Sequence, residues 1–351
     1  MEVTVAQQKT HISVVAIPDA VISTLGGIYD VFNALPAIAA IDDSVPTPTP
    51  LQVEIVAQSH DSVPLASGLS IAPHRGIDEV IRSDIIIVPS VLLHDGWRQG
   101  RYPALVAWLK ERYEQGAVLC SACSGLFLLA ETGLFDGHEC TVHWAYANQF
   151  RRQYPEIPVS PEKPLVVSGE RQQLISSGAS TSWQDLVLYL LAQHTGPTAA
   201  QAIAKFFALQ WHLEGLAPYA PFMPVHDHGD ATVLEAQRWL ERHYSVASPV
   251  DEMVTRSGLA QRTFKRRFSR ATGLSPIGYV QQLRIDEAKR RLERTRLPVD
   301  EISWQIGYED PAFFRRLFKR LTGITPGAHR RRFQLSPAAT ESPRPAGIAG
   351  N

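Results

Sequence analysis

A cysteine in the setting of a nucleophile lies at Cys123, within the stretch 117–130. The apolar run 117–120 predicts a strand, the run 126–130 predicts a helix, and the residues between them form a sharp turn. A thiol at such a turn lies beside the helix N-terminus, where the partial positive charge favours the thiolate and lowers the thiol pKa. We therefore expect Cys123 to be reactive and Cys120 to be buried in the strand, although a small packed cysteine also fits the pattern.

Basic side chains gather in a second pattern, a repeat that aligns 264–276 with 314–326. In each copy two Phe residues four apart mark the buried face of a helix, basic residues fill the exposed face, and Thr-Gly predicts a left-handed C-terminal end. A short amphipathic segment and a turn with Gly258 or Gly307 precede the copies. Each copy therefore predicts a helix-turn-helix motif.

The exposed faces of the two repeated helices are the expected DNA-reading surface, since recognition helices enter the major groove. Arg266 is expected to read a base edge, although a phosphate contact alone would fit as well, and Arg267 and Arg270 are expected to meet phosphates. Ala312 can contact only a thymine methyl. The expected DNA contacts are Arg262, Lys265, Arg266 and Arg270 in the first copy and Ala312, Arg315, Arg316 and Lys319 in the second.

One long helix over 277–295 is expected to join the two motifs, because its apolar residues follow a single stripe. Its 19 residues would span about 29 Å. That length would hold the two recognition helices about one turn of DNA apart, so both could enter successive major grooves on one face.

The net charge of −1 hides two halves of opposite sign. Residues 1–230 hold 12 Lys and Arg against 23 Asp and Glu, whereas residues 231–333 hold 21 against 11. The first half thus carries −11 and the second +10, which suits a nucleic-acid partner but also fits solvated basic helices.

In the first half, short Val- and Ile-rich runs alternate with helical stretches, the rhythm of a parallel sheet covered by helices. We therefore expect an α/β domain with a flavodoxin-like, mostly parallel sheet and helices on both faces, followed by an all-α domain. The Pro/Thr segment 44–50 is expected to be a surface connection. The expected strands are 11–17, 51–58, 84–89, 117–120, 165–168 and 174–177, and the expected helices are 102–115 and 181–193.

The second repeat carries a resemblance to a known family, through the string 302–326 (ISWQIGYEDPAFFRRLFKRLTGITP) together with Arg284 and Ala288. The C-terminal half resembles the DNA-binding domain of AraC/XylS-type transcriptional regulators. The resemblance covers about 100 residues and implies double-stranded promoter DNA and RNA polymerase as partners.

Residues 11–212 resemble the ThiJ/PfpI, type 1 glutamine amidotransferase-like domain that precedes an AraC-type domain in GlxA-like regulators. The stretch Cys123-Ser124-Gly125, with 134–137 and 141–144, carries the resemblance. It implies that Cys123 occupies the nucleophile position, that His143 faces it, and that Asp185 occupies an acidic position. His143 also fits a surface or capping histidine. The expected ligand-binding residues are Cys123, Ser124, Gly125 and His143.

Two departures weaken an enzymatic interpretation. Thr24 stands where enzymatic relatives place a carboxylate, and Ser124 follows the cysteine where a histidine is frequent. Without a general base of known role, we expect no catalysis, and Cys123, His143 and Asp185 would be vestigial. The alternatives are a Cys-dependent hydrolase or amidotransferase tethered to DNA, and an architectural DNA protein with an inert N-terminal domain.

The expected organisation is a sensing domain over 1–212, a linker over 213–230, the DNA-binding domain over 231–333 and a disordered tail over 334–351. Residues 226–228 (His-Asp-His) could in principle bind metal, but we expect a linker and no metal or cofactor. With no signal peptide or membrane span, and with reduced thiols, the protein is expected in the cytoplasm. We also expect activation of transcription, a small-molecule effector and a homodimer through the N-terminal domain.

Overall fold

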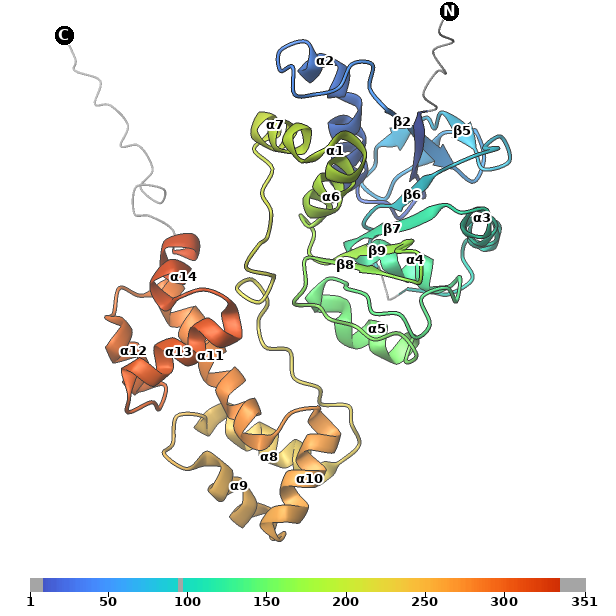
Figure 1. The fold of residues 1–351 in the computed structure, drawn as a ribbon. Helices are drawn as coiled ribbons and strands as arrows, with labels where there is room; N and C mark the ends of the chain where they lie inside the picture. Colours follow the sequence, from blue (N-terminus) through green and yellow to red (C-terminus); the bar gives the residue numbers. More distant parts are fainter. Residues whose placement is uncertain (1–8, 94–96, 335–351) are drawn as a thin grey trace, which may run out of the picture. The chain divides into compact units, whose positions relative to one another are not determined.

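The computed structural model describes residues 9–93 and 97–334, and the chain divides into an N-terminal unit, residues 1–216, and a C-terminal unit, residues 217–351 (Figure 1). The division falls within the segment expected as a linker. The tail expected to be disordered lies outside the described residues from 335 onward. In the described part, no helix combines the length and apolar character needed to cross a membrane.

A seven-stranded sheet forms the centre of the N-terminal unit, in the order β5-β2-β1-β6-β7-β9-β8. Neighbouring strands are parallel except β8 and β9. Every strand expected from an apolar run forms, because Val and Ile on both faces are buried under helices. The strands are β1 (Thr10–Val15), β2 (Leu51–Ala57), β5 (Arg75–Gly76), β6 (Ile85–Val88), β7 (Val118–Ala122), β8 (Leu165–Ser168) and β9 (Leu174–Ser177), and a separate pair joins β3 (Val63–Pro64) to β4 (Ser70–Ile71).

Helices cover both faces of this sheet, as expected (Figure 1). On one face α1 and α6 contact each other and the strands, and on the other α3 and α4 contact each other and β7. The helices are α1 (Ile22–Asn33), α2 (Leu35–Ala39), α3 (Pro103–Glu114), α4 (Leu126–Ala130), α5 (Ala147–Gln153), α6 (Trp183–Thr195) and α7 (Pro197–Phe207).

Over residues 217–334, the regular structure of the C-terminal unit is all helical and encloses two hydrophobic cores. The first core contains Phe264 and Phe268, the second contains Phe314 and Phe318, and all four rings are fully buried, as the repeat predicts. The helices are α8 (Ala231–His243), α9 (Pro249–Ser257), α10 (Gln261–Thr272), α11 (Pro276–Arg294), α12 (Val299–Gln305), α13 (Pro311–Thr322) and α14 (Pro326–Phe333).

Each predicted motif takes its expected form, α9–α10 for the first and α12–α13 for the second, and the single long helix is α11. Gly258 and Gly307 have φ of +63° and +94°, and Gly273 and Gly323 end α10 and α13 at +73° and +81°. Glycine adopts this left-handed backbone without steric penalty, which is why the repeat carries it at each turn.

The first residues of the C-terminal unit pack on α11 instead of running free. The ammonium of Lys289 donates to the carbonyls of Ala217 (2.6 Å) and Ala220 (2.8 Å). The N–H of Phe222 donates to Asp286 at 3.1 Å, and its ring lies 4.9 Å from that of Tyr279. Burial lowers the pKa of Lys289 to about 8. Residues 217–222 therefore belong structurally to the C-terminal unit, ahead of the boundary at residue 231 expected from the sequence.

Candidate functional site

The turn after β7 is the sharp elbow that the sequence predicts. Cys123 has a φ of +54° and opens a short 3-10 turn, Cys123–Gly125, that leads into α4. A Cβ on Gly125 would lie 2.4 Å from the carbonyl oxygen of Pro89 and 2.5 Å from that of Val88, so only glycine fits. The elbow therefore packs tightly against the carboxyl end of β6, next to the point where the sheet order reverses between β1 and β6.

The thiol of Cys123 is buried, with 3% of the residue exposed. Burial raises the pKa of this thiol, and the Ser124 N–H and the hydroxyls of Ser90, Ser124 and Ser180 oppose that rise only in part. The expectation of a lowered thiol pKa is therefore wrong, because desolvation outweighs the hydrogen bonds that favour the thiolate. Cys120, as expected, is fully buried.

Hydroxyl groups occupy the place where enzymatic relatives would carry an acid. Thr24 is buried on α1, and its hydroxyl donates to Ser90 at 3.1 Å. Ser124 is also occupied, since its hydroxyl donates to the carbonyl of Val91 at 2.6 Å and accepts from the N–H of Val91 at 2.9 Å. Ser124 thus ties the elbow to the segment after β6, and its hydroxyl is directed at protein backbone.

His143 caps a short 3-10 turn, Trp144–Tyr146, by accepting the N–H of Ala145 at Nδ1 over 3.2 Å. Its ring lies 4.6 Å from that of Trp144 and 5.6 Å from that of Tyr146, and burial lowers its pKa. This is the capping role left open by the sequence. Among the described residues, the groups that lower the pKa of the Cys123 thiol belong to Ser90, Ser124 and Ser180, and His143 is not one of them.

Asp185 lies in the first turn of α6 and is 2% exposed. Its carboxylate accepts the N–H of His212 at 2.8 Å and contacts Nδ1 of the same residue at 2.6 Å. Leu216, four residues after His212, is fully buried, and its N–H donates to the carbonyl of Glu162 at 2.8 Å. Asp185 therefore anchors the end of the N-terminal unit.

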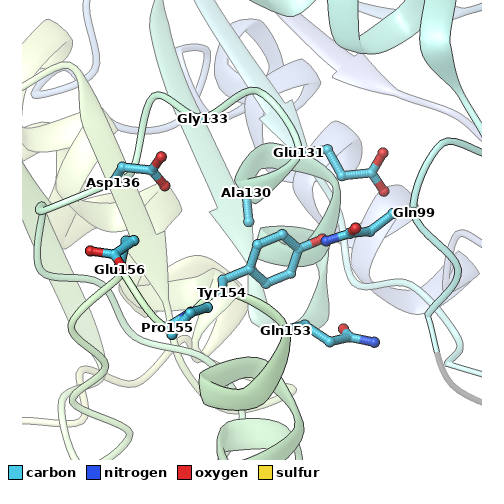
Figure 2. A pocket seen from close by; sticks show the side chains of 9 residues that line it. All are labelled: Gln99, Ala130, Glu131, Gly133, Asp136, Gln153, Tyr154, Pro155 and Glu156. Carbon is cyan, nitrogen blue, oxygen red and sulfur yellow. The ribbon is translucent and has the colours of Figure 1, made fainter.

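A pocket of about 360 Å³ opens elsewhere in the N-terminal unit, and none of the predicted ligand residues lines it. Figure 2 shows the carboxylates of Glu131, Asp136 and Glu156 around the ring of Tyr154. Glu131 is held by the indole N–H of Trp97 at 2.5 Å and by the N–H of Gly100 at 2.9 Å. Nothing in the sequence signals this pocket, because its walls come from three separate segments of the chain. No group of three His, Cys, Asp or Glu side chains in the described ranges could hold a metal ion.

On α10, the expected base-reading residues Arg262, Lys265 and Arg266 are exposed, and so is Arg270 nearer the C-terminal end. Arg267 differs from the expectation of a phosphate contact, because its Nε and Nη2 bind the carboxylate of Asp230 at 2.9 and 2.8 Å. That ion pair joins α10 to the N-cap of α8.

On α13, the expected residues Ala312, Arg315, Arg316 and Lys319 are all exposed. Arg315 forms an ion pair with Asp300 of α12 at 2.5 Å, and Arg316 lies 3.9 Å from Asp310. The basic groups of this helix therefore have acidic neighbours.

Three further exposed residues adjoin these faces and were not singled out from the sequence. Gln261 opens α10, while Trp304 on α12 and Phe313 on α13 are 59% and 40% exposed. The signal for Trp304 and Phe313 is a large apolar residue on the polar face of an amphipathic helix.

Comparison with known proteins agrees with this geometry in both units. The model of a helix-turn-helix domain matches residues 253–332, and that of the DJ-1/PfpI family matches residues 37–193. The HTH-type transcriptional regulator CdhR of Pseudomonas aeruginosa is 28% identical over 296 residues, which cover 80% of this chain and 82% of CdhR. GbdR of the same species is 25% identical over 285 residues (81% of this chain, 76% of GbdR), and GlxA of Rhizobium meliloti is 25% identical over 222 residues (60% of this chain, 64% of GlxA).

The relatives CdhR and GbdR align across most of both chains, so the order of the two domains is shared as well as each domain. The chain combines a DJ-1/PfpI domain with an AraC-type helix-turn-helix domain, which is the composition of a DNA-binding transcriptional regulator, and its relatives CdhR, GbdR and GlxA are HTH-type transcriptional regulators.

Proposed function

We propose that this regulator reads promoter DNA through α10 and α13 together and activates transcription when its N-terminal unit binds a small effector. The observation that carries the proposal is the division of both helices into a fully buried Phe face and an exposed basic face. Basic side chains neutralise phosphates, and Arg can read guanine through two hydrogen bonds.

The two helices supply different chemistry for base reading. On α10, Arg266 suits guanine and the amide of Gln261 suits adenine, whereas Ala312 and Phe313 on α13 suit thymine methyl groups. Arg270 and Lys319 lie further along their helices, where phosphate contacts are expected. We therefore expect a DNA site in which one half is read mainly by polar groups and the other half mainly by apolar groups.

Selection of binding sites from randomised duplex by the full chain tests this proposal. We expect one recurring site with two unequal halves about one helical turn apart, bound with an affinity that falls steeply with salt. A fragment over 217–334 should bind the same site, since residues 217–222 pack on α11. The acidic residues 1–216 should not. Failure of the full chain to select any site would contradict the proposal.

We propose that the N-terminal unit senses without catalysis. Thr24 and Ser90 stand near a buried thiol of raised pKa, and His143 caps a turn, so none of the described groups that act on the Cys123 thiol is a general base that could activate a nucleophile. A metabolite panel scored by thermal shift would reveal an effector, because a ligand that favours the folded state raises its melting temperature.

Cys123→Ala should abolish or alter the thermal shift caused by an effector bound at the elbow. Cys140→Ala is the matched control, since Cys140 is another buried cysteine of the same unit. Turnover of a substrate by residues 1–216, lost in Cys123→Ser, would instead favour the DNA-tethered hydrolase.

The remaining parts of the proposal concern partners and location. We propose that the protein acts on promoter DNA beside RNA polymerase, in the cytoplasm. Dimerisation is assigned to the N-terminal unit, and light scattering on residues 1–216 and on the full chain tests it: a monomer in both would overturn that assignment.

A further inference from the structure

The long helix α11 belongs to two hydrophobic cores in succession. Tyr279, Val280 and Leu283 pack in the core that contains the first recognition helix. Ile285, Ala288 and Leu292 pack in the core that contains the second. The change from one core to the other therefore occurs at Arg284, the residue between Leu283 and Ile285.

Arg284 is 6% exposed, and its guanidinium binds backbone from both sides of this boundary. Nε donates to the carbonyl of Tyr244 at 2.7 Å, and Nη2 donates to that of Val246 at 2.8 Å. Nη1 donates to the carbonyl of Gly307 at 2.8 Å. Tyr244 and Val246 follow α8, which packs in the core of the first motif, whereas Gly307 forms the turn of the second, so one side chain joins the two.

We call this contact between the two motifs the joint. The guanidinium group is chemically suited to it. Its donors form a rigid planar fork, so three carbonyls in different directions can be bound at once, which a single ammonium cannot do in the same geometry. The carbonyls of Tyr244 and Val246 lie at the C-terminal end of α8, where the helix dipole is negative. The ring of Tyr308 lies 5.0 Å from the guanidinium carbon and adds a cation–π contact.

The backbone at the joint approaches so closely that only glycine fits at position 307. A Cβ there would lie 2.5 Å from the carbonyl oxygen of Ser245 and 2.8 Å from Nη2 of Arg284. The two motifs thus meet through Gly307, Ser245 and Arg284, in a contact with little room for adjustment.

We propose that Arg284 is the positioning residue that sets the spacing and orientation of α10 and α13, and so determines which separation of half-sites the protein accepts. The inference rests on the two-helix reading of DNA proposed above. Arg284 is buried and acts through the joint, without touching DNA.

A rigid joint makes the second helix bind at a high effective concentration once the first is bound. When the joint loosens, that advantage falls while each helix keeps its own contacts. Loss of Arg284 should therefore weaken binding to the complete site far more than binding to either half, and should relax the preferred spacing.

The test uses the full chain and three duplexes: the selected site, the same site with one half scrambled, and the same site with one base pair inserted between the halves. One inserted pair turns the second half by about 34° around the duplex axis. We expect the wild type to bind the inserted duplex at least about 10-fold more weakly than the selected site, because a rigid joint cannot follow that turn.

Arg284→Lys keeps the charge but loses the fork. We expect it to bind the complete site about 10- to 100-fold more weakly, to bind the scrambled duplex within about 2-fold of wild type, and to lose most of the penalty for the inserted pair. Arg290→Lys is the control on the same helix, since Arg290 is half-exposed and pairs with Glu287. It should behave as wild type.

Equal losses on complete and half sites would overturn the proposal, because they would indicate damage to folding or to each helix alone. If Arg284→Lys unfolds, as judged by circular dichroism, the wild-type measurement on the inserted duplex decides. The wild-type measurement needs no variant at all: tolerance of the inserted pair without loss would refute a rigid joint. Failure of the full chain to select any site would instead refute the proposed reading of DNA by both helices. That outcome would be known before the three duplexes are made.

Discussion

The two recognition helices come from one repeated motif, yet the basic side chains on their exposed faces differ in whether they form ion pairs. On α10, Arg262, Lys265 and Arg266 are exposed, and no ion pair joins them to the described residues. On α13, Arg315 pairs with Asp300, and Arg316 lies near Asp310. If α13 contacts DNA as proposed, acidic residues of α12 and of the turn would compete with DNA for its basic side chains.

The comparison shows that the two copies of the motif share their buried residues and differ in their exposed residues. Both copies need two Phe residues and a closing glycine to form the core and the turn. The outward residues carry no such structural demand. We therefore expect α10 to provide most of the base-specific polar contacts and α13 to provide shape and apolar contacts.

The sharpest challenge to this comparison is Arg266→Ala. Loss of a two-point guanine contact should cost about 1 to 3 kcal/mol at the selected site and relax the preference at one or two base pairs. Binding titrations and a repeated site selection measure both effects. An unchanged base preference would show that Arg266 only contacts phosphate and that α10 owes its role to other residues.

Arg270→Ala tests the C-terminal half of the same helix. Arg270 is exposed near the end of α10, so its loss should weaken all sequences about equally and reduce the slope of log affinity against log salt by about one. Titrations at several salt concentrations on the selected site and on random duplex give the slope. A loss confined to one sequence would move Arg270 into the base-reading group.

The outline of the fold could be predicted because it depends on local periodicity. Phe264, Phe268, Phe314 and Phe318 lie four apart in pairs, and their burial follows from helix geometry alone. The Val- and Ile-rich strands were found for the same reason. Their order across the sheet depends on pairing between strands far apart in the chain, which local periodicity does not reveal.

The environments of the site residues depend on contacts between distant parts of the chain, and these were not predicted. Asp185 binds His212, and Arg267 binds Asp230, across 27 and 37 residues. The pKa of Cys123 was expected to fall because the helix N-terminus is visible in the sequence, whereas the segments that bury the thiol are not. Arg284 was noticed only through a family resemblance, and its three carbonyl partners emerge from the structure.

A smaller effect should follow from releasing Arg315. Asp300→Asn removes the ion pair on an exposed surface, where such pairs contribute at most about 1 kcal/mol, so DNA affinity should rise by no more than that amount. Glu301→Gln is the matched control, because it removes the same charge from the neighbouring position of α12, where Glu301 bonds Gln305. A gain in Asp300→Asn alone would show that the ion pair restrains α13, whereas equal gains would indicate a general charge effect.

The smallest effect is expected for Cys123→Ala without effector. Cys123 lies in the N-terminal unit and its thiol is buried among hydroxyls, so the substitution changes neither recognition helix nor the charge of the chain. A substitution at a site independent of the DNA-binding surface should leave the DNA affinity within about 2-fold of wild type. Titration of the selected site by wild type, Cys123→Ala and Cys140→Ala checks this. A larger loss of DNA affinity in Cys123→Ala alone, with the melting temperature preserved, would mean that the elbow controls the C-terminal unit even without a ligand. The contributions of α10 and α13 would then have to be compared both with and without the Cys123 side chain.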